Sequence, residues 1–344
     1  MREQLSAKPI IREYEQLEAI ALPEQREVLV GHKENYSSLI AQAKNKKLPG
    51  AILLHGQRGI GKASFAFLLA KEIFALGGDE NKSQIDEQVA QGSYPNLFIL
   101  RKTPKPPKGF YSEIRITDVR EIQKRMQKTR GRAGHRICII DSIDDCNQKA
   151  SNALLKILEE PPSDTIFILI SHRPGSLLPT IHSRCHSYGF RTLDDEKVRE
   201  ITNIALGKTE HNDIDICIKL ANGVPRRAIE AALFDKLSLL KDLEQWLYSN
   251  DFHSPLTHLT LAEDIVKSQA AEQVFAHDVI ISYIGEQANF IAKENPINRV
   301  QLASITKLWE KANNMFASSQ EYNLDKKQTL VSIFDAIIQY KQLL

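Results

Sequence analysis

Cysteine is scarce in this chain of 344 residues, and long apolar runs are missing. The four cysteines form no C-x-x-C pair, so we expect reduced thiols and neither disulfides nor a zinc knuckle. No apolar run approaches the ~18 residues that a membrane-spanning helix needs, and the first residues lack the apolar core of a secretory signal. These absences predict a cytoplasmic protein that makes no membrane contact.

A strong excess of charge of one sign is also lacking. The net charge at pH 7 is +2, from 45 Lys and Arg against 43 Asp and Glu. Composition alone therefore does not indicate a nucleic-acid partner. Hydrophobic residues make up 42% and charged residues 26% of the chain, which is ordinary for a protein that buries a proper core. A chain of this length accommodates two or three domains.

A glycine-rich segment between a strand pattern and a helix pattern is the most informative motif. The apolar run Ala51–His55 is followed by Gly56-Gln-Arg-Gly-Ile-Gly-Lys62 and then by an amphipathic helix pattern. Gly56, Gly59 and Gly61 let backbone N–H groups close around phosphate oxygens, and Lys62 adds a positive charge. The segment predicts a P-loop, with a chance glycine turn as the alternative. The apolar face of the helix consists of Phe65, Leu68, Leu69 and Ile73.

Two groups that hydrolysis requires are missing from this pattern. The P-loop motif ends in a Ser or Thr whose hydroxyl holds Mg²⁺, and here that position is Ala63. Ser64 is rotated by about 100° around the helix, so it is a poor substitute. The apolar run Arg136–Asp141 ends in the acid of a Walker B motif, but the next residue, usually a glutamate that polarises water, is Ser142. We therefore expect no hydrolysis at a useful rate.

Two further groups of polar residues have simpler interpretations. Asp144 and Asp145 follow the Walker B run, and we interpret them as caps of a helix that begins around residue 147, with replacement of the missing glutamate as the alternative. His182, Cys185 and His186 have a spacing that would need a helix to bind a metal, whereas this segment is typical of a loop entering a strand. We expect no metal there.

Strand and helix patterns alternate up to about residue 190 and then give way to helix patterns alone. This alternation predicts a parallel sheet covered by helices on both faces. The predicted strands are Ala51–His55, Leu97–Leu100, Arg136–Asp141, Thr165–Ser171 and His186–Phe190. Helices are predicted at Asp194–Leu206 and Asp213–Leu233, the latter broken at Gly223-Val-Pro225. We predict an α/β P-loop domain at residues 1–191, a small helical lid domain at 192–235 and an all-α collar domain at 236–344.

Four motifs in a fixed order resemble a known family. They are the glycine loop, Ile-Ile-Asp141-Ser, Asn152-Ala-Leu-Leu-Lys-Ile-Leu-Glu-Glu-Pro-Pro162, and Leu178-Pro-Thr-Ile-His-Ser-Arg-Cys185. Together they resemble the AAA+ subunits of the bacterial clamp loader, most narrowly the type in which a degenerate P-loop accompanies an intact Ser-Arg-Cys motif. The resemblance covers Val30 to Arg227 and reaches the later helices only by length and position.

The resemblance implies a ring of subunits rather than a solitary enzyme. Gamma/tau-type ATPase subunits and a clamp-opening delta subunit are the implied partners, held through the helical C-terminal domain, and the ring places the sliding clamp on primed DNA. Arg184 matches the family's arginine finger, which reaches the ATP bound by the neighbouring subunit. A surface or structural arginine is the alternative.

The resemblance also implies a degenerate nucleotide site. Arg226 is a sensor arginine or only holds two domains in register, and Ser171 binds phosphate or satisfies a backbone group at its strand end. We expect no tightly bound cofactor, at most weak ATP or ADP binding. Zinc is not expected, because no cysteine lies between Lys62 and Arg136. The remaining residues of this site are Gly56, Gly59, Gly61, Lys62 and Asp141.

A basic segment at residues 120–136 has two interpretations. It contains one acid and seven basic residues: Arg120, Lys124, Arg125, Lys128, Arg130, Arg132 and Arg136. These residues either contact the phosphates of primed DNA or form a solvated helix face or a subunit contact. We favour the second interpretation because no aromatic residues are interleaved. For the whole chain, an active P-loop ATPase of the helicase type and a nucleotide-binding regulatory module remain the alternatives.

Overall fold

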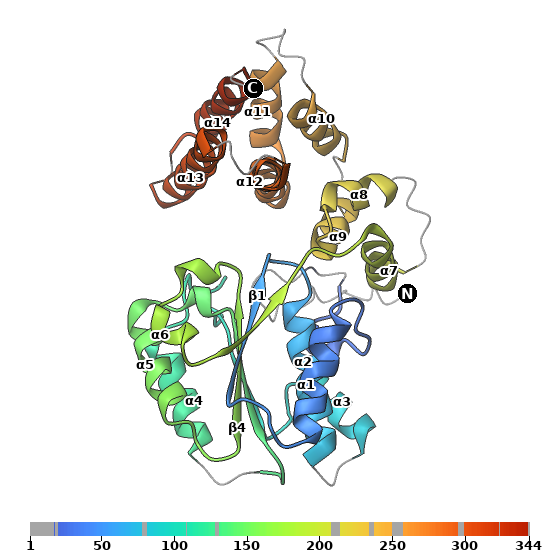
Figure 1. The fold of residues 1–344 in the computed structure, drawn as a ribbon, viewed down its shortest axis with the longest axis vertical. Helices are drawn as coiled ribbons and strands as arrows, with labels where there is room; N and C mark the ends of the chain where they lie inside the picture. The colour runs from blue at the N-terminus through green and yellow to red at the C-terminus, as the bar shows by residue number, and fades with distance from the viewer. Residues whose placement is uncertain are drawn as a thin grey trace, which may run out of the picture. The chain divides into compact units, whose positions relative to one another are not determined.

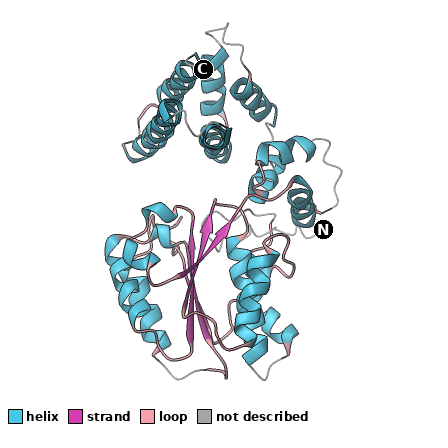
Figure 2. Ribbon diagram, in the orientation of Figure 1, coloured by secondary structure: helices cyan, strands magenta, loops and turns pink. Residues whose placement is uncertain are grey.

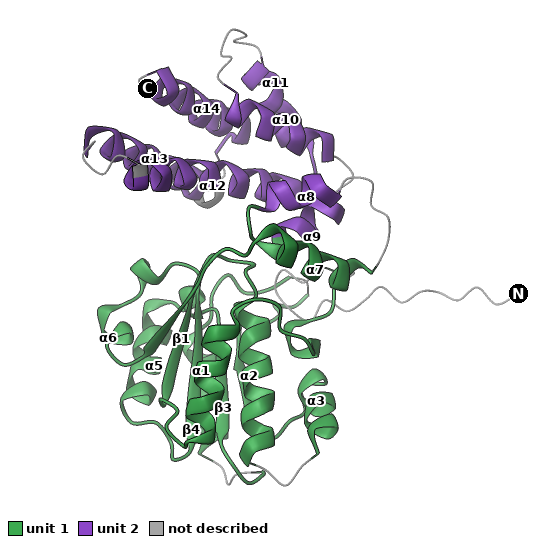
Figure 3. Ribbon diagram, turned by 45° about the vertical axis from the view of Figure 1, so that its right-hand side comes forward, with its two compact units in different colours: residues 1–210, 222–226 green, residues 211–221, 227–344 purple. Residues whose placement is uncertain are grey.

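The computed structural model describes residues 17, 20–77, 81–107, 109–127, 131–207, 214–233, 237–249, 257–294, 299–322 and 324–342. The chain divides into two compact units (Figure 3). Unit 1 comprises Met1–Glu210 and Asn222–Arg226, and unit 2 comprises His211–Ala221 and Arg227–Leu344. The finer division into three domains stays a prediction.

A five-stranded parallel sheet forms the centre of unit 1 (Figure 2). The order of its strands is β2-β3-β4-β1-β5, so β4 lies in the middle. Every residue of β4 is buried, as expected for a strand with helices on both faces. The strands are β1 Ala51–Gly56, β2 Leu97–Leu100, β3 Arg136–Asp141, β4 Thr165–Ser171 and β5 His186–Phe190. The five predicted strands are confirmed, with β1 one residue longer.

Helices cover both faces of this sheet (Figure 1). One face carries α1 (Lys33–Lys44), α2 (Lys62–Gly77) and α3 (Lys82–Ala90). The other carries α4 (Ile116–Met126), α5 (Gln148–Glu159) and the short α6 (Pro179–His182). Helix α7 (Asp195–Leu206) follows β5, and 3-10 turns lie at Pro23–Gln25, Ile143–Asp145 and Pro174–Ser176.

Helix α2 is buried on more than the one apolar face that the sequence predicted. Besides the predicted face, Phe67 and Phe74 are buried, at 0% and 3% exposure. The reason is that α2 packs against the sheet and also against α1 and α3. The periodicity of apolar residues predicts one buried face of a helix and does not show which other helices pack on its remaining sides.

The start of α5 corrects one expectation. Asn147 is its N-cap, and the Asn147 side chain accepts a hydrogen bond from the Ala150 N–H at 2.9 Å. Asp144 and Asp145 belong to the preceding 3-10 turn instead. Their interpretation as caps of α5 was therefore wrong, although the predicted start of the helix was right.

Helices are the regular secondary structure of unit 2 within its described residues. Its helices include α8 (Ile214–Ala221), α10 (Leu237–Tyr248), α11 (Thr257–Lys267), α12 (Ala270–Glu294), α13 (Arg299–Glu321) and α14 (Lys326–Gln342), together with most of α9 (Pro225–Leu233). Phe275, Ile280 and Phe334 lie in its apolar core, each exposed by 2% or less. No helix in the described part of the chain is long and apolar enough to cross a membrane.

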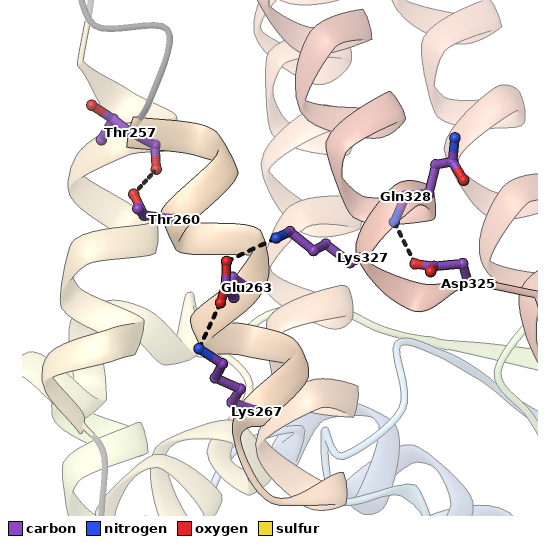
Figure 4. A network of polar contacts seen from close by, with 7 residues as sticks. All are labelled: Thr257, Thr260, Glu263, Lys267, Asp325, Lys327 and Gln328. Carbon is purple, nitrogen blue, oxygen red and sulfur yellow. Dashed lines mark hydrogen bonds and ion pairs between the residues drawn. The ribbon is translucent and has the colours of Figure 1, made fainter.

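Polar contacts supplement this core at the surface of unit 2. Glu263 of α11 accepts hydrogen bonds from Lys267 at 2.6 Å and from Lys327 of α14 at 2.8 Å (Figure 4). The hydrogen bond from Lys267, followed by that from Lys327, lowers the pKa of Glu263 to about 2. Asp325 caps the first turn of α14 by accepting from the Gln328 N–H at 2.8 Å. Because these groups are exposed, the contacts orient the helices more than they stabilise them.

Candidate functional site

The loop between β1 and α2 needs glycine for two separate reasons. Gly56, Gly59 and Gly61 have φ of +148°, +83° and +99°, which other residues rarely adopt. A Cβ at Gly56 would also lie 2.4 Å from the Phe190 carbonyl oxygen, and one at Gly59 would lie 2.6 Å from the Arg226 Cβ. At Gly61 no atom lies within 4 Å of that position. The loop therefore packs on the protein at its first two glycines and is open at the third.

Lys62 is held by this same loop. Its side chain is buried, and its Nζ donates hydrogen bonds to the carbonyl oxygens of Gly56 and Gln57, both at 2.7 Å. Burial lowers the pKa of Lys62 to about 7, although the nearby charges of Asp141 and Asp144 oppose this shift. An ammonium group has three N–H donors, so these two hydrogen bonds leave one donor for an incoming phosphate.

Asp141 ends β3 beside two cations. Burial raises the pKa of its carboxyl group, while Arg101 and then Lys62 oppose that effect. Arg101 directly follows β2, and its guanidinium forms an ion pair with Glu24 at 3.2 Å. The sequence interpretation missed Arg101. Its position directly after β2 could have indicated it, because the residues that follow parallel strands gather at one edge of the sheet.

Asp144 organises the ends of β3 and β4. Its carboxylate accepts hydrogen bonds from the Ser142 hydroxyl at 2.7 Å, the Ser171 hydroxyl at 2.9 Å and the His172 N–H. Burial raises the pKa of Asp144, but these hydrogen bonds outweigh burial and lower it overall. Ser171 thus donates to a side chain and not to a backbone group at its strand end.

The donor set fits phosphate better than a divalent metal. Ala63 offers no hydroxyl, Ser142 offers no carboxylate, and the charges of Arg101 and Lys62 act on Asp141. Within the described ranges no three His, Cys, Asp or Glu side chains are grouped to hold a metal ion. Gly61 and Lys62, in contrast, present an open backbone and an ammonium group at the start of α2, where an anion is favoured.

The three residues weighed as metal ligands near β5 lie on different elements. The Nε2 of His182 lies 2.8 Å from the Pro174 carbonyl oxygen, within hydrogen-bond distance. Cys185 is buried, which raises the pKa of its thiol to about 11. His186 is the first residue of β5, so the three side chains do not share the helical face that metal binding would need. All four cysteines of the chain are free thiols.

Arg226 does lie at the P-loop. Its N–H donates to the Gly59 carbonyl oxygen at 3.2 Å, and its Cβ fills the space beside Gly59. Its positive charge also acts on Asp141. The contact with Gly59 is a structural role, and nucleotide sensing by Arg226 stays a prediction.

Arg184 forms its hydrogen bonds away from the P-loop. It follows α6, and its Nη2 lies 2.6 Å from the Glu159 Oε1 while its Nη1 donates to the Thr180 carbonyl oxygen at 3.0 Å. The side chain of Arg184 is 33% exposed. A side chain that acts on another subunit has to be at least partly exposed. Sequence reasoning had no signal for the pairing with Glu159, because the two residues lie on different elements.

The basic segment does not form one surface. Arg120, Lys124 and Arg125 are exposed on α4, whose opposite face is buried. Arg136, in contrast, is buried at the start of β3 and donates to the Met126 carbonyl oxygen. Its inclusion in an exposed cluster was wrong, because a count of charges ignores the strand to which a residue belongs. Lys128 and Arg130 lie outside the described residues.

Comparisons with known proteins agree with this geometry. A family model described as "DNA polymerase III, delta subunit" matches residues 31–194. The chain is 36% identical over 139 residues to the DNA polymerase III subunit delta' of Pseudomonas aeruginosa, covering 39% of this chain and 41% of that protein. It is 33% identical over 157 residues to subunit delta' of Bacillus subtilis, covering 45% and 46%. The chain thus spans less than half the length of these relatives.

Solved structures with a similar fold include two from Thermotoga maritima. A DNA polymerase III gamma subunit-related protein has a TM-score of 0.41 at 17% identity, over 88% of this chain and 99% of the other. The RuvB Holliday junction branch migration motor has a TM-score of 0.44 at 16% identity, over 92% and 91%. At such scores the two likenesses carry no argument about function.

The parallel sheet, the P-loop between β1 and α2 and the helices that follow define an AAA+ protein, as the sequence predicted. Over residues 31–194 the chain is similar to the delta prime subunits of DNA polymerase III. The resemblance indicated by the sequence motifs is therefore confirmed over these residues.

The lowered pKa of Lys62 predicts a pH-dependent affinity for phosphate. Lys62 is an ammonium below its pKa of about 7 and loses its charge above it, whereas bound phosphate favours the charged form. We expect the affinity for metal-free ADP, measured by calorimetry between pH 6 and 9, to fall by up to about tenfold per pH unit above pH 7. Lys62→Met should weaken binding and remove this dependence, while Lys44→Met, at an exposed lysine, should not. An unchanged pH dependence in Lys62→Met would contradict the assignment.

Proposed function

We propose that the chain is a non-hydrolysing AAA+ subunit of a replicative clamp loader. The observation that carries the proposal is an intact glycine cradle with Lys62, in a chain similar to the delta prime subunits, beside Ala63 and Ser142. The side chains that would hold Mg²⁺ and activate water are replaced while the backbone that surrounds phosphate is kept. The proposed role places the protein in the cytoplasm, at sites of DNA replication.

The partners follow from this role. The chain completes a ring with gamma/tau-type ATPase subunits and a clamp-opening delta subunit, using its C-terminal helices. The ring then places the sliding clamp on primed DNA. Support for the ATPase partners comes from 27% identity over 224 residues to the DNA polymerase III subunit tau of Bacillus subtilis, covering 63% of this chain and 38% of that protein.

Arg184 is the residue through which the chain contributes to hydrolysis. In the proposed ring its guanidinium reaches the γ-phosphate of ATP bound by the neighbouring subunit and stabilises the negative charge of the transition state. Arginine suits this task because its planar fork offers several donors and stays charged at any physiological pH. The chain's own nucleotide site binds ATP or ADP weakly, through Gly61 and Lys62, without hydrolysis.

The experiment that tests this proposal compares the chain alone with the assembled ring. Purified alone, the chain should hydrolyse no ATP above background, since Ala63 and Ser142 lack the required groups. Added to gamma/tau-type and delta subunits with clamp and primed DNA, it should be required for full ATPase activity. Steady turnover by the chain alone that disappears in Lys62→Ala would instead identify an active P-loop ATPase.

A further inference from the structure

The guanidinium of Arg184 is already occupied within its own subunit. The Glu159 carboxylate binds Nη2 at 2.6 Å, and the Thr180 carbonyl oxygen accepts from Nη1 at 3.0 Å. The carboxylate therefore neutralises the charge that a phosphate would meet, and both terminal nitrogens of the fork are engaged. To reach a neighbouring nucleotide, Arg184 has to exchange the Glu159 carboxylate for phosphate oxygens.

The position of Glu159 in its helix explains why it pairs with Arg184. Glu159 is the last residue of α5, where the negative end of the helix dipole disfavours a carboxylate. Lys156, in the same turn, is the kind of residue such an end favours. The guanidinium of Arg184 supplies the compensating charge for Glu159. The neighbouring Glu160, at the C-cap, is exposed; its backbone N–H donates to the Lys156 carbonyl oxygen, and its side chain forms no hydrogen bond or ion pair with the described part of the chain.

The backbone that carries Arg184 is fixed on both sides. Ile181 is buried at 1% exposure and Cys185 at 9%, so the chain is anchored before and after the finger. His182 contacts the Pro174 carbonyl oxygen, which ties α6 to the preceding turn. Because the backbone is held, rotation of the Arg184 side chain is the simplest motion that moves the guanidinium from one partner to another.

We propose that Glu159 is a positioning residue that holds Arg184 in a parked state and competes with the phosphate of the neighbouring nucleotide. This inference rests on the proposed function. The two side chains are 33% and 48% exposed, so water screens the ion pair and the restraint is small, at most about fivefold in rate. A γ-phosphate brought into reach overcomes it, because phosphate offers more negative charge and more acceptor oxygens than one carboxylate.

The parked state predicts the behaviour of Glu159→Gln, which keeps the shape of the side chain and removes its charge. In a reconstituted ring without clamp or DNA, the variant should raise basal ATP hydrolysis by up to about fivefold. The control Glu160→Gln changes the adjacent carboxylate and should leave the basal rate unchanged. The double variant Arg184→Ala/Glu159→Gln should match Arg184→Ala alone, because Glu159 acts only through Arg184.

A measurement on the isolated full chain tests the contact without any partner. The side-chain N–H groups of Arg184, followed by ¹⁵N NMR, should exchange with solvent faster in Glu159→Gln than in the unmodified chain or in Glu160→Gln. Unchanged exchange, or a basal ring ATPase that equals or falls below that of Glu160→Gln, would overturn the parked state. If Arg184→Ala still slows the ring in that case, the proposed function survives and only this inference fails.

Discussion

Replacing Arg184 by alanine should slow ATP hydrolysis by the neighbouring subunit of a reconstituted ring by at least tenfold. The developing negative charge on the transferred phosphoryl group would lose its cationic partner. In GTPases a guanidinium supplied in trans contributes about 10³–10⁵ in rate, which sets the upper end of the expected effect. Lysine should rescue poorly, because a point ammonium on a flexible stem does not reproduce the planar donor fork.

The fold and the assembly of the ring should survive this change, since the Arg184 side chain is 33% exposed and makes only surface contacts. The matched control is Arg191→Ala, at an exposed arginine just after β5. The measurement is ATPase activity stimulated by clamp and primed DNA, together with the amount of clamp loaded. Unchanged hydrolysis and unchanged loading in Arg184→Ala would leave the chain with a purely architectural role.

The strands of unit 1 could be predicted because local pattern and tertiary environment agree there. Thr165–Ser171 contains an unbroken run of five apolar residues, and its position in the middle of a parallel sheet buries all seven residues of the strand. The P-loop could be predicted equally well, because few other structures have this spacing of glycines between a strand and a helix. A motif that depends on backbone conformation can therefore be predicted from the spacing of its residues.

The charged partners of the site could not be predicted, because each pairing joins residues from different elements. Arg101 follows β2 whereas Asp141 ends β3, and Glu159 ends α5 whereas Arg184 follows α6. Asp144 shows a local preference overruled by tertiary contacts. Its acidic side chain suits a helix cap, but hydrogen bonds from Ser142 and Ser171 hold it between the ends of two strands.

The shape of the loop does not depend on the side chains that hydrolysis would require. The cradle depends on backbone and packing, with Phe190 against Gly56 and Arg226 against Gly59. Hydrolysis depends on two side chains, at positions 63 and 142, and Ser142 instead hydrogen-bonds Asp144. Loss of those two functional groups leaves the packing of the loop intact. The backbone that carries Arg184 can therefore be held in place whether or not the chain's own nucleotide site hydrolyses ATP.

The largest effect on stability should come from Phe167→Ala, at the centre of the sheet of unit 1. Phe167 is 0% exposed on β4, and its register neighbours on β1 and β3 are the small residues Ala51 and Cys138. Neither neighbour can fill the space that the ring leaves, so transfer and cavity costs add. We expect the free energy of unfolding of unit 1 to fall by about 3–5 kcal/mol.

Phe290→Ala removes the same ring from a side chain that is 62% exposed in unit 2, so it should change stability by no more than about 0.5 kcal/mol. The measurement is amide hydrogen exchange with increasing denaturant, because the amides of β1, β3 and β4 report on unit 1 by themselves. Loss of protection across these three strands in Phe167→Ala, with none in Phe290→Ala, is the expected result. If Phe167→Ala lowered the free energy of unfolding by less than about 2 kcal/mol, the helices on this face would have to move into the space left by the ring. The sheet would then not set the packing of the site.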